Sequence, residues 1–177
     1  RRLSEMGILT AEDPVEEIGD LGDDDVVVIP AFGVSAGDLE RLREAGPILV
    51  DTTCGSVLAV WKNVTKYAKN GFTALIHGKY RHEETRATAS RALLHTGGQY
   101  LVVRDAEEVG LVCDYIRGQG RREEFLGRFE GAYSPEFDPD RHLERVGMAN
   151  QTTMLASESI QIQEMVRDAM VERFGTD

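Results

Sequence analysis

Val50-Asp51-Thr52-Thr53-Cys54-Gly55 is the stretch of sequence that best indicates how this chain folds. It completes the apolar run 48–50, which is typical of a strand, and it leads into residues 57–68, whose apolar side chains recur at helical spacing. The stretches 76–85 and 150–154 have the same plan, an apolar run followed by polar residues and a helical segment. Because ligands bind at such strand ends in open α/β sheets, we expect the three stretches to meet in one site.

Apolar runs alternate with amphipathic segments along the whole chain. The pattern predicts strands at 8–9, 26–30, 48–50, 73–76, 100–103 and 146–149, with helices near 1–6, 35–44, 53–70, 83–94, 105–116, 122–129 and 157–174. The β-branched run 26–30 is of the kind that is buried on both faces of a parallel sheet. This alternation predicts parallel α/β layers.

Polar residues and glycines mark the expected helix ends. Ser35 and Asp105 are predicted N-caps, Thr52 or Thr53 is expected to cap the helix after the opening stretch, and Ser157 or Ser159 to begin the last one. Gly175 is expected to terminate that last helix.

Composition and charge limit the classes of function. The 177 residues can bury a core as one domain or two small ones, and no apolar run approaches the roughly 20 residues that span a bilayer. A formal net charge of −11 argues against a general role in binding nucleic acid or anionic membranes. Two cysteines do not make a disulfide framework, so a reducing compartment is expected.

The two cysteines have different predicted roles. Cys54 lies where a strand passes into a helix N-terminus, and free N–H groups and the helix dipole there favour the thiolate that ligates metal or attacks carbon. The alternative is a small residue in a strand–helix turn. Cys113 shares an apolar helix face with Val109 and Ile116, which predicts a packing role.

His82 and Glu84 lie two residues apart after the third predicted strand. If the segment is still extended, both side chains point the same way, and an imidazole beside a carboxylate suits proton delivery. In the alternative interpretation the acidic residues only decorate the first turn of a helix. Lys79, Arg81 and His82 also form a cationic cluster that could hold a phosphate.

Three functions are compatible with these residues alone. The first is a redox enzyme whose metal centre uses Cys54, and the second is a thiol hydrolase or transferase that uses Cys54 with His82 and Glu84. The third is a zinc site built from Cys54, His77, His82 and Cys113, which has irregular spacing and no close Cys or His pair.

The three polar stretches together resemble the LytB family of hydroxymethylbutenyl diphosphate reductases. The resemblance rests on Asp51–Cys54, on His77–Thr85 (HGKYRHEET) and on Asn150–Leu155 (NQTTML), and it extends over essentially the whole chain. The last two motifs and Phe32, where other bacterial members tend to carry His, indicate the plant and cyanobacterial-like branch. Gly55 stands at a position where members of this family commonly have Pro.

The resemblance implies an α/β fold with small, mainly parallel sheets flanked by helices, as part of a three-lobed reductase around a [4Fe-4S] cluster. It makes Cys54 one of three cluster ligands, Glu84 the proton donor, and His82 and Thr152 substrate-binding groups. The implied reaction reduces an allylic hydroxyl diphosphate to isopentenyl and dimethylallyl diphosphates, the last step of the non-mevalonate isoprenoid pathway. Ferredoxin or flavodoxin is the implied electron donor, and the cytoplasm or the plastid stroma the implied location.

The resemblance also implies that other parts of the enzyme lie outside this chain. The family's first and third cluster cysteines are expected before Arg1 and after Asp177. Residues 1–54 would then be the end of the first lobe, and residues 55–177 the second lobe leading toward the third. A non-catalytic α/β module is the remaining alternative for the chain by itself.

Overall fold

The computed structural model describes residues 2–10 and 21–176, and it begins with a two-stranded parallel sheet beside a helix. After α1 (Arg2–Glu5), strand β1 (Val26–Ile29) pairs with β2 (Ile48–Asp51), and α3 (Ala36–Ala45) connects them. The predicted N-cap of α3 is confirmed, because the Ser35 side chain accepts a hydrogen bond from the Asp38 N–H.

The second part of the chain builds a three-stranded parallel sheet. Its central strand is β3 (Thr73–His77), which pairs with β4 (Tyr100–Val103) on one side and β5 (Val146–Asn150) on the other. All five residues of β3 are buried, and this accounts for its continuous apolar run. The prediction of parallel α/β layers is confirmed in both sheets.

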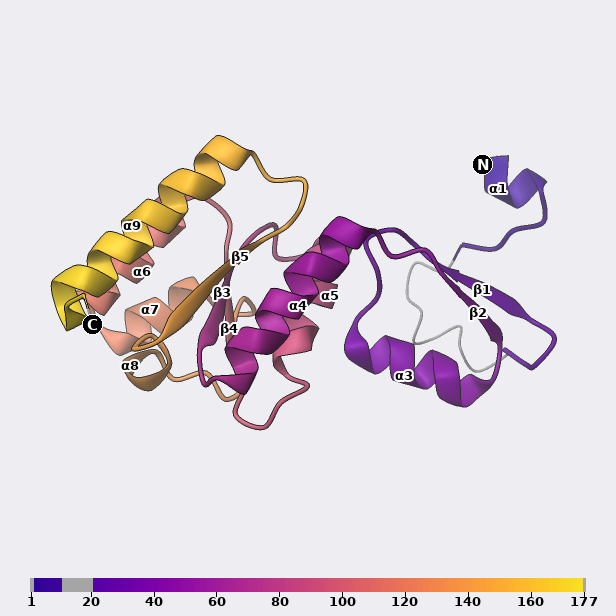
Figure 1. The fold of residues 1–177 in the computed structure, drawn as a ribbon, viewed down its shortest axis with the longest axis horizontal. Helices are drawn as coiled ribbons and strands as arrows, with labels where there is room; N and C mark the ends of the chain where they lie inside the picture. The colour runs from indigo at the N-terminus through magenta and orange to yellow at the C-terminus, as the bar shows by residue number, and fades with distance from the viewer. Residues whose placement is uncertain (1, 11–20, 177) are drawn as a thin grey trace.

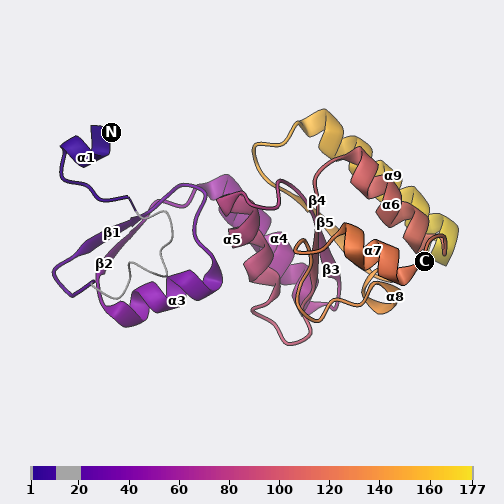
Figure 2. The same ribbon diagram turned by 180° about the vertical axis from the view of Figure 1, so that it is seen from behind.

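Helices cover both faces of the second sheet (Figure 1 and Figure 2). On one face α4 (Gly55–Lys69) packs against α5 (Glu83–Ala92), and on the other α6 (Ala106–Ile116) packs against α9 (Ala156–Phe174). Two short helices, α7 (Arg122–Arg128) and α8 (Pro139–His142), lie between β4 and β5 in sequence. The main core lies between these layers, and Cys113 is part of it, as predicted.

Several helix starts differ from those expected. The N-cap of α4 is Cys54 rather than Thr52 or Thr53, and its side chain makes no capping hydrogen bond. The last helix begins at Ala156, after Leu155, so it starts just before the predicted serines. Asp105 caps α6 and Gly175 ends α9, as predicted.

Among the described residues, no helix is long and apolar enough to cross a membrane.

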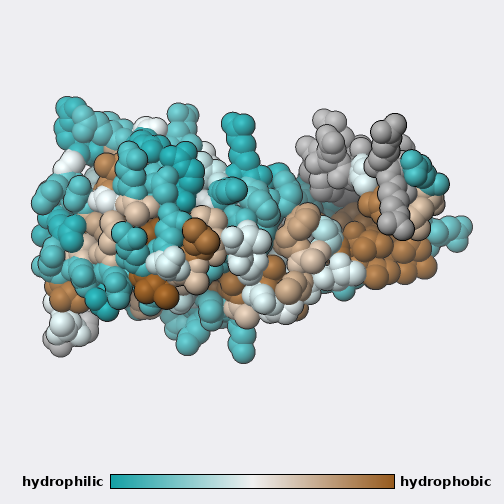
Figure 3. Space-filling model, turned by 90° about the horizontal axis from the view of Figure 1, so that it is seen from above, coloured by the Kyte–Doolittle hydropathy of each residue, from teal (hydrophilic) through white to brown (hydrophobic). Residues whose placement is uncertain are grey.

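The first sheet is less covered than its sequence suggests. Val26 and Val28 are 59% and 60% exposed, so the expectation that this run is buried on both faces is wrong. Ile48 and Val50 lie beside them in the parallel register, and the four side chains form an exposed apolar face, which we call the β1–β2 face. Hydrophobic residues gather at this end of the molecule in Figure 3. Helix α3 covers only the opposite side.

The predicted strand at Ile8–Leu9 is also wrong. The two residues form neither strand nor helix, and Leu9 is 92% exposed. Two apolar residues become a strand only where a neighbouring strand accepts their backbone hydrogen bonds, and none pairs with them in the described part of the chain. Residues 11–20, which follow shortly after, lie outside the described residues.

One buried arginine joins the two sheets. The Arg91 guanidinium lies 3.7 Å from the centre of the Trp61 ring, and Nη2 donates a 3.0 Å hydrogen bond to the Val34 carbonyl. The Trp61 indole N–H donates to Thr88 at 3.2 Å. The Trp61 ring also lies where a side chain at Gly33 would be, 2.4 Å from an added Cβ, and Gly33 has φ +75°. Close packing therefore fixes the connection after β1 against α4 and α5.

We predict that the β1–β2 face makes the chain bind hydrophobic dyes. The double substitution Val26→Thr and Val28→Thr removes two of the four exposed side chains, so dye fluorescence should fall by about half, while circular dichroism stays unchanged. Leu111→Gln is the control, because Leu111 is 41% exposed on α6, away from this face. An equal loss of fluorescence in the control would contradict the assignment of the dye to the β1–β2 face.

Candidate functional site

The predicted site residues lie at the carboxyl ends of parallel strands. Cys54 follows β2, His82 and Glu84 follow β3, and Thr152 follows β5. Backbone hydrogen bonds shape the first of these connections: the Thr52 N–H donates to Ile29 (3.1 Å) and the Cys54 N–H to Ala31 (2.8 Å). The cysteine is therefore held by the connection after β1 as well as by its own strand.

The Cys54 thiol is exposed and electrostatically favoured as a thiolate. Polar groups of the first turn of α4, namely the Ser56 N–H and side chain and the Val57 N–H, stabilise the thiolate and so lower the pKa of Cys54. The negative charge of Glu84 acts in the opposite direction, which places the carboxylate within electrostatic reach of the thiol. Cys54 and Glu84 thus lie within electrostatic reach of one another, although they are 30 positions apart in the sequence.

Glu84 is a buried carboxylate at the start of α5, only 3% exposed. Its Oε1 accepts a short hydrogen bond from the backbone N–H of Thr152, so it joins the loop after β3 to the loop after β5. The segment is not extended, as one sequence interpretation required: Glu84 lies in the first turn of the helix. The alternative, in which the acidic residues lie in the first turn of a helix, is confirmed in its placement, but the Glu84 carboxylate is also buried and bound by the Thr152 N–H.

His82 is the N-cap of α5. Its Nδ1 accepts a 3.2 Å hydrogen bond from the Glu84 N–H, so the neutral ring carries its proton on Nε2. The Phe32 ring meets the imidazole edge to face, with 6.3 Å between ring centres. Phe32 comes from the connection after β1, so this contact also joins the two sheets at the site.

Gln151 connects the polar stretches, and the sequence did not predict these contacts of its amide. Its side chain is buried, and Oε1 accepts hydrogen bonds of 3.1 Å from both the Lys79 N–H and the Thr85 hydroxyl. Its Nε2 donates to the Thr153 hydroxyl at 2.7 Å. The absence of a side chain at Gly78 leaves room for the hydrogen bond between Thr85 and Gln151, because an added Cβ would lie 2.7 Å from the Thr85 Oγ1. One amide therefore fixes the loop after β3, helix α5 and the loop after β5 together.

The residues of the suggested zinc site do not come together. Cys113 lies in the apolar core, and the buried His77 ring faces α9, where Nδ1 is 3.1 Å from the Ser159 Oγ. Burial lowers the pKa of His77, which favours its neutral form. Within the described ranges, no group of three or more His, Cys, Asp or Glu side chains is arranged to hold a metal ion. The zinc hypothesis is therefore wrong for these four residues.

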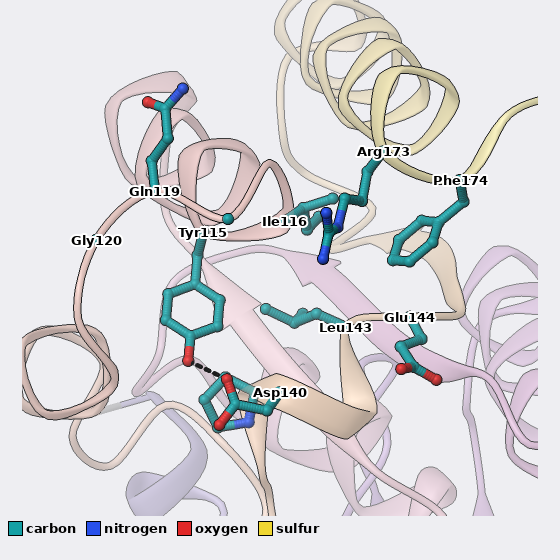
Figure 4. A pocket seen from close by; sticks show the side chains of 11 residues that line it. Tyr115, Ile116, Gln119, Gly120, Asp140, Leu143, Glu144, Arg173 and Phe174 are labelled. Atoms are coloured by element: carbon teal, nitrogen blue, oxygen red, sulfur yellow. Dashed lines mark hydrogen bonds between the residues drawn. The ribbon is translucent and has the colours of Figure 1, made fainter.

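A separate cavity of about 220 Å³ lies at the other end of the second sheet (Figure 4). It is lined by the C-terminal ends of α6 and α9 and by α8, and the Tyr115 hydroxyl donates to the Asp140 carboxylate at its edge. Neither Cys54 nor Glu84 lines it. The presence of a cavity therefore does not identify the candidate chemical site, which is defined by the convergence of loops at the carboxyl strand ends.

An exposed thiol with a lowered pKa and a buried carboxylate, both at the carboxyl ends of parallel strands, define an α/β protein with a candidate polar site. The sequence model of one family, described as "LytB protein", matches residues 1–176. The chain therefore belongs to the LytB family.

The curated relatives agree with this assignment. The 4-hydroxy-3-methylbut-2-enyl diphosphate reductase of Synechococcus sp. (strain RCC307) is 50% identical over 175 residues, and that of Prochlorococcus marinus (strain NATL1A) is 47% identical. Each alignment covers 98% of this chain but only 42% of the relative. The chain thus spans about two fifths of the length of these cyanobacterial proteins.

Solved structures share the fold at low identity. A reductase from Plasmodium falciparum, described as acting on E-1-hydroxy-2-methyl-but-2-enyl-4-diphosphate, aligns with a TM-score of 0.63 and 20% identity, over 94% of this chain and 42% of that one. A second, described as the terminal enzyme of the non-mevalonate pathway, aligns with a TM-score of 0.54 and 16% identity, over 95% and 66%. At these identities the likeness supports the fold alone, and it agrees with the predicted fold class.

We predict that the two cysteines react at very different rates with iodoacetamide. Cys54 is exposed with a lowered pKa, so its alkylation should rise with pH and reach half its maximum below the ordinary thiol pKa of about 8.5. Burial raises the pKa of Cys113 to about 11, so this thiol should react only after unfolding in urea. Mass spectrometry of the two peptides measures both rates. Equal labelling of both cysteines in the native chain would contradict the assignment.

Proposed function

We propose that the protein containing this chain is a 4-hydroxy-3-methylbut-2-enyl diphosphate reductase, an oxidoreductase of the non-mevalonate pathway. The observation that supports the proposal is the hydrogen bond from the Thr152 N–H to the buried Glu84 carboxylate, in a chain half identical to cyanobacterial proteins of that name. In this assignment residues 1–54 close a first lobe, and residues 55–177 form a second that leads toward a third.

The Cys54 donor fits one ligand position of a [4Fe-4S] cluster. An exposed thiol at the N-terminus of a 15-residue helix, with backbone N–H groups that stabilise its thiolate, has the chemistry such a ligand needs. When bound, the cluster supplies electrons and an open iron that polarises the leaving oxygen. The other two cysteine ligands would come from outside this chain, and a ferredoxin or flavodoxin would be the donor of electrons.

Glu84 is the residue proposed to deliver the proton. Its carboxylate is buried, lies within electrostatic reach of Cys54 and is oriented by the Thr152 N–H. A carboxyl group held in this way can protonate a leaving hydroxyl without exposing the reaction to bulk water. Thr152, whose hydroxyl belongs to the same loop, is proposed to support the substrate hydroxyl.

His82, with the neighbouring Lys79 and Arg81, is proposed to bind the diphosphate. The three residues fall in one short loop at the carboxyl end of β3, and Lys79 and Arg81 carry the local positive charge that a chain of net charge −11 needs to attract an anion. The neutral His82 ring can donate from Nε2, because its Nδ1 is already engaged with the Glu84 N–H.

A cysteine-dependent hydrolase using the same three side chains is the second candidate function. The lowered pKa of Cys54 is the observation that favours it. It requires activity in the absence of iron, whereas the reductase requires iron and a reductant. An assay of the full-length protein with and without a chelator distinguishes the two functions, and a chain with neither activity would be a non-catalytic module.

We predict that Glu84→Gln in the full-length, cluster-loaded enzyme lowers the rate of substrate reduction by at least about 100-fold, because the amide cannot donate the proton. Iron and sulfide content should stay at the wild-type level, since Glu84 is not a proposed ligand. Glu83→Gln is the matched control: its carboxylate is exposed and pairs with Arg86, and turnover should be unchanged. Normal turnover in Glu84→Gln would refute the proton-donor role.

The isolated 177-residue chain is predicted not to retain a cluster. Cys113 is buried in the core, so Cys54 is left as the chain's one accessible cysteine, and a single thiolate cannot hold four irons. Anaerobic reconstitution followed by desalting and iron and sulfide analysis tests this. Four irons per chain, retained by the monomer, would show that the proposed ligand set is wrong.

A further inference from the structure

A buried carboxylate next to the site has no part in the chemistry described so far. Glu108, in the first turn of α6, is 0% exposed. Its Oε2 accepts a short hydrogen bond from the Tyr80 hydroxyl and a 2.8 Å bond from the Arg104 N–H. Its Oε1 accepts no hydrogen bond, but the guanidinium groups of Arg128 and Arg104 lie 3.1 and 3.3 Å away.

The charges of this cluster balance one another. Arg104 also pairs with Asp105 at 3.0 Å, so two arginines face two carboxylates. Burying an uncompensated carboxylate would cost several kcal/mol, and the paired arrangement offsets that cost. An equal balance also means that the cluster adds no net negative charge beside a loop that would receive an anion.

Tyr80 is the link between this cluster and the site. It lies in the middle of the loop 78–82, between Lys79, whose N–H is bound by Gln151, and Arg81. The His82 N–H donates to the Lys79 carbonyl at 3.0 Å and closes the turn around Tyr80. The Glu108 hydrogen bond therefore fixes the centre of a turn whose ends lead into β3 and into His82. Burial of Tyr80, and after it the hydrogen bond to Glu108, raises the pKa of the Tyr80 hydroxyl. The hydroxyl therefore stays protonated and able to donate.

We infer that Glu108 is a positioning residue which, through the Tyr80 hydroxyl, holds the loop 78–82 in the conformation that binds the diphosphate end of the substrate. The inference rests on the proposed function. It assigns Glu108 no contact with substrate and no proton transfer. Its effect is on the placement of Lys79, Arg81 and His82.

The test uses the full-length, cluster-loaded protein with Tyr80→Phe, which removes the hydroxyl and keeps the ring. We expect KM for the allylic diphosphate to rise about tenfold, the size of one lost hydrogen bond to a charged group, while kcat changes less than twofold. Glu108→Gln should act in the same direction. The KM of the double variant should be no higher than that of Glu108→Gln alone, because each substitution removes the same hydrogen bond between Tyr80 and Glu108.

Tyr115→Phe is the matched control. The Tyr115 hydroxyl also donates to a carboxylate, that of Asp140, and its pKa is also raised, to about 12, but it borders the cavity away from the site. This substitution should leave KM unchanged. A KM within twofold of wild type in Tyr80→Phe, an equal rise in Tyr115→Phe, or fully additive effects in the double variant would overturn the inference.

Amide hydrogen exchange separates this inference from the proposed function. Tyr80→Phe should speed exchange at residues 78–82 about tenfold and leave α9 unchanged. If wild type does not reduce the substrate, the proposed function fails, and the exchange rates alone decide whether Glu108 holds the loop. If wild type is active but neither exchange nor KM responds to Tyr80→Phe, the inference fails and the proposed function stands.

Discussion

The hydrogen bond from the Thr152 backbone N–H to the Glu84 carboxylate is the contact on which the geometry of the site depends. It spans the gap between the loops after β3 and β5, neighbouring strands of one sheet. A carboxylate that is buried needs donors, and here the donor belongs to the backbone of the loop that also carries the Thr152 hydroxyl. The proposed acid is thus held against the backbone of the residue that carries the proposed substrate-binding hydroxyl.

Around this contact the structure places two supporting polar groups on different sides. Gln151 ties the loops together from within the sheet edge, and Glu108 holds the same loop from α6 through Tyr80. Both are buried, and each satisfies most of its polar atoms with partners from separate elements. Polar networks of this kind are costly when incomplete, so they confer rigidity on the loops that they join. The exposed side chains, Lys79 and Arg81, remain free to meet a ligand.

Much of this arrangement could be predicted from the sequence, because each strand is a short apolar run followed by polar residues. The strands, the Asp105 cap and the buried Cys113 were predictable from local pattern. The exposure of Val26 and Val28 was not, since a β-branched run does not reveal whether another layer covers it. Nor was the pairing of Tyr80 with Glu108, 28 positions apart, because long-range contacts between polar residues leave no periodic signal.

The backbone hydrogen bond from Cys54 to Ala31 ties the thiol to the first sheet, and Cys54 is also the N-cap of α4, which packs on the second sheet, whereas Glu84 belongs to the second sheet alone. The packed Trp61–Arg91 pair holds the first sheet against α4 and α5. The separation of thiol and acid is therefore set by the angle at which the two sheets are packed.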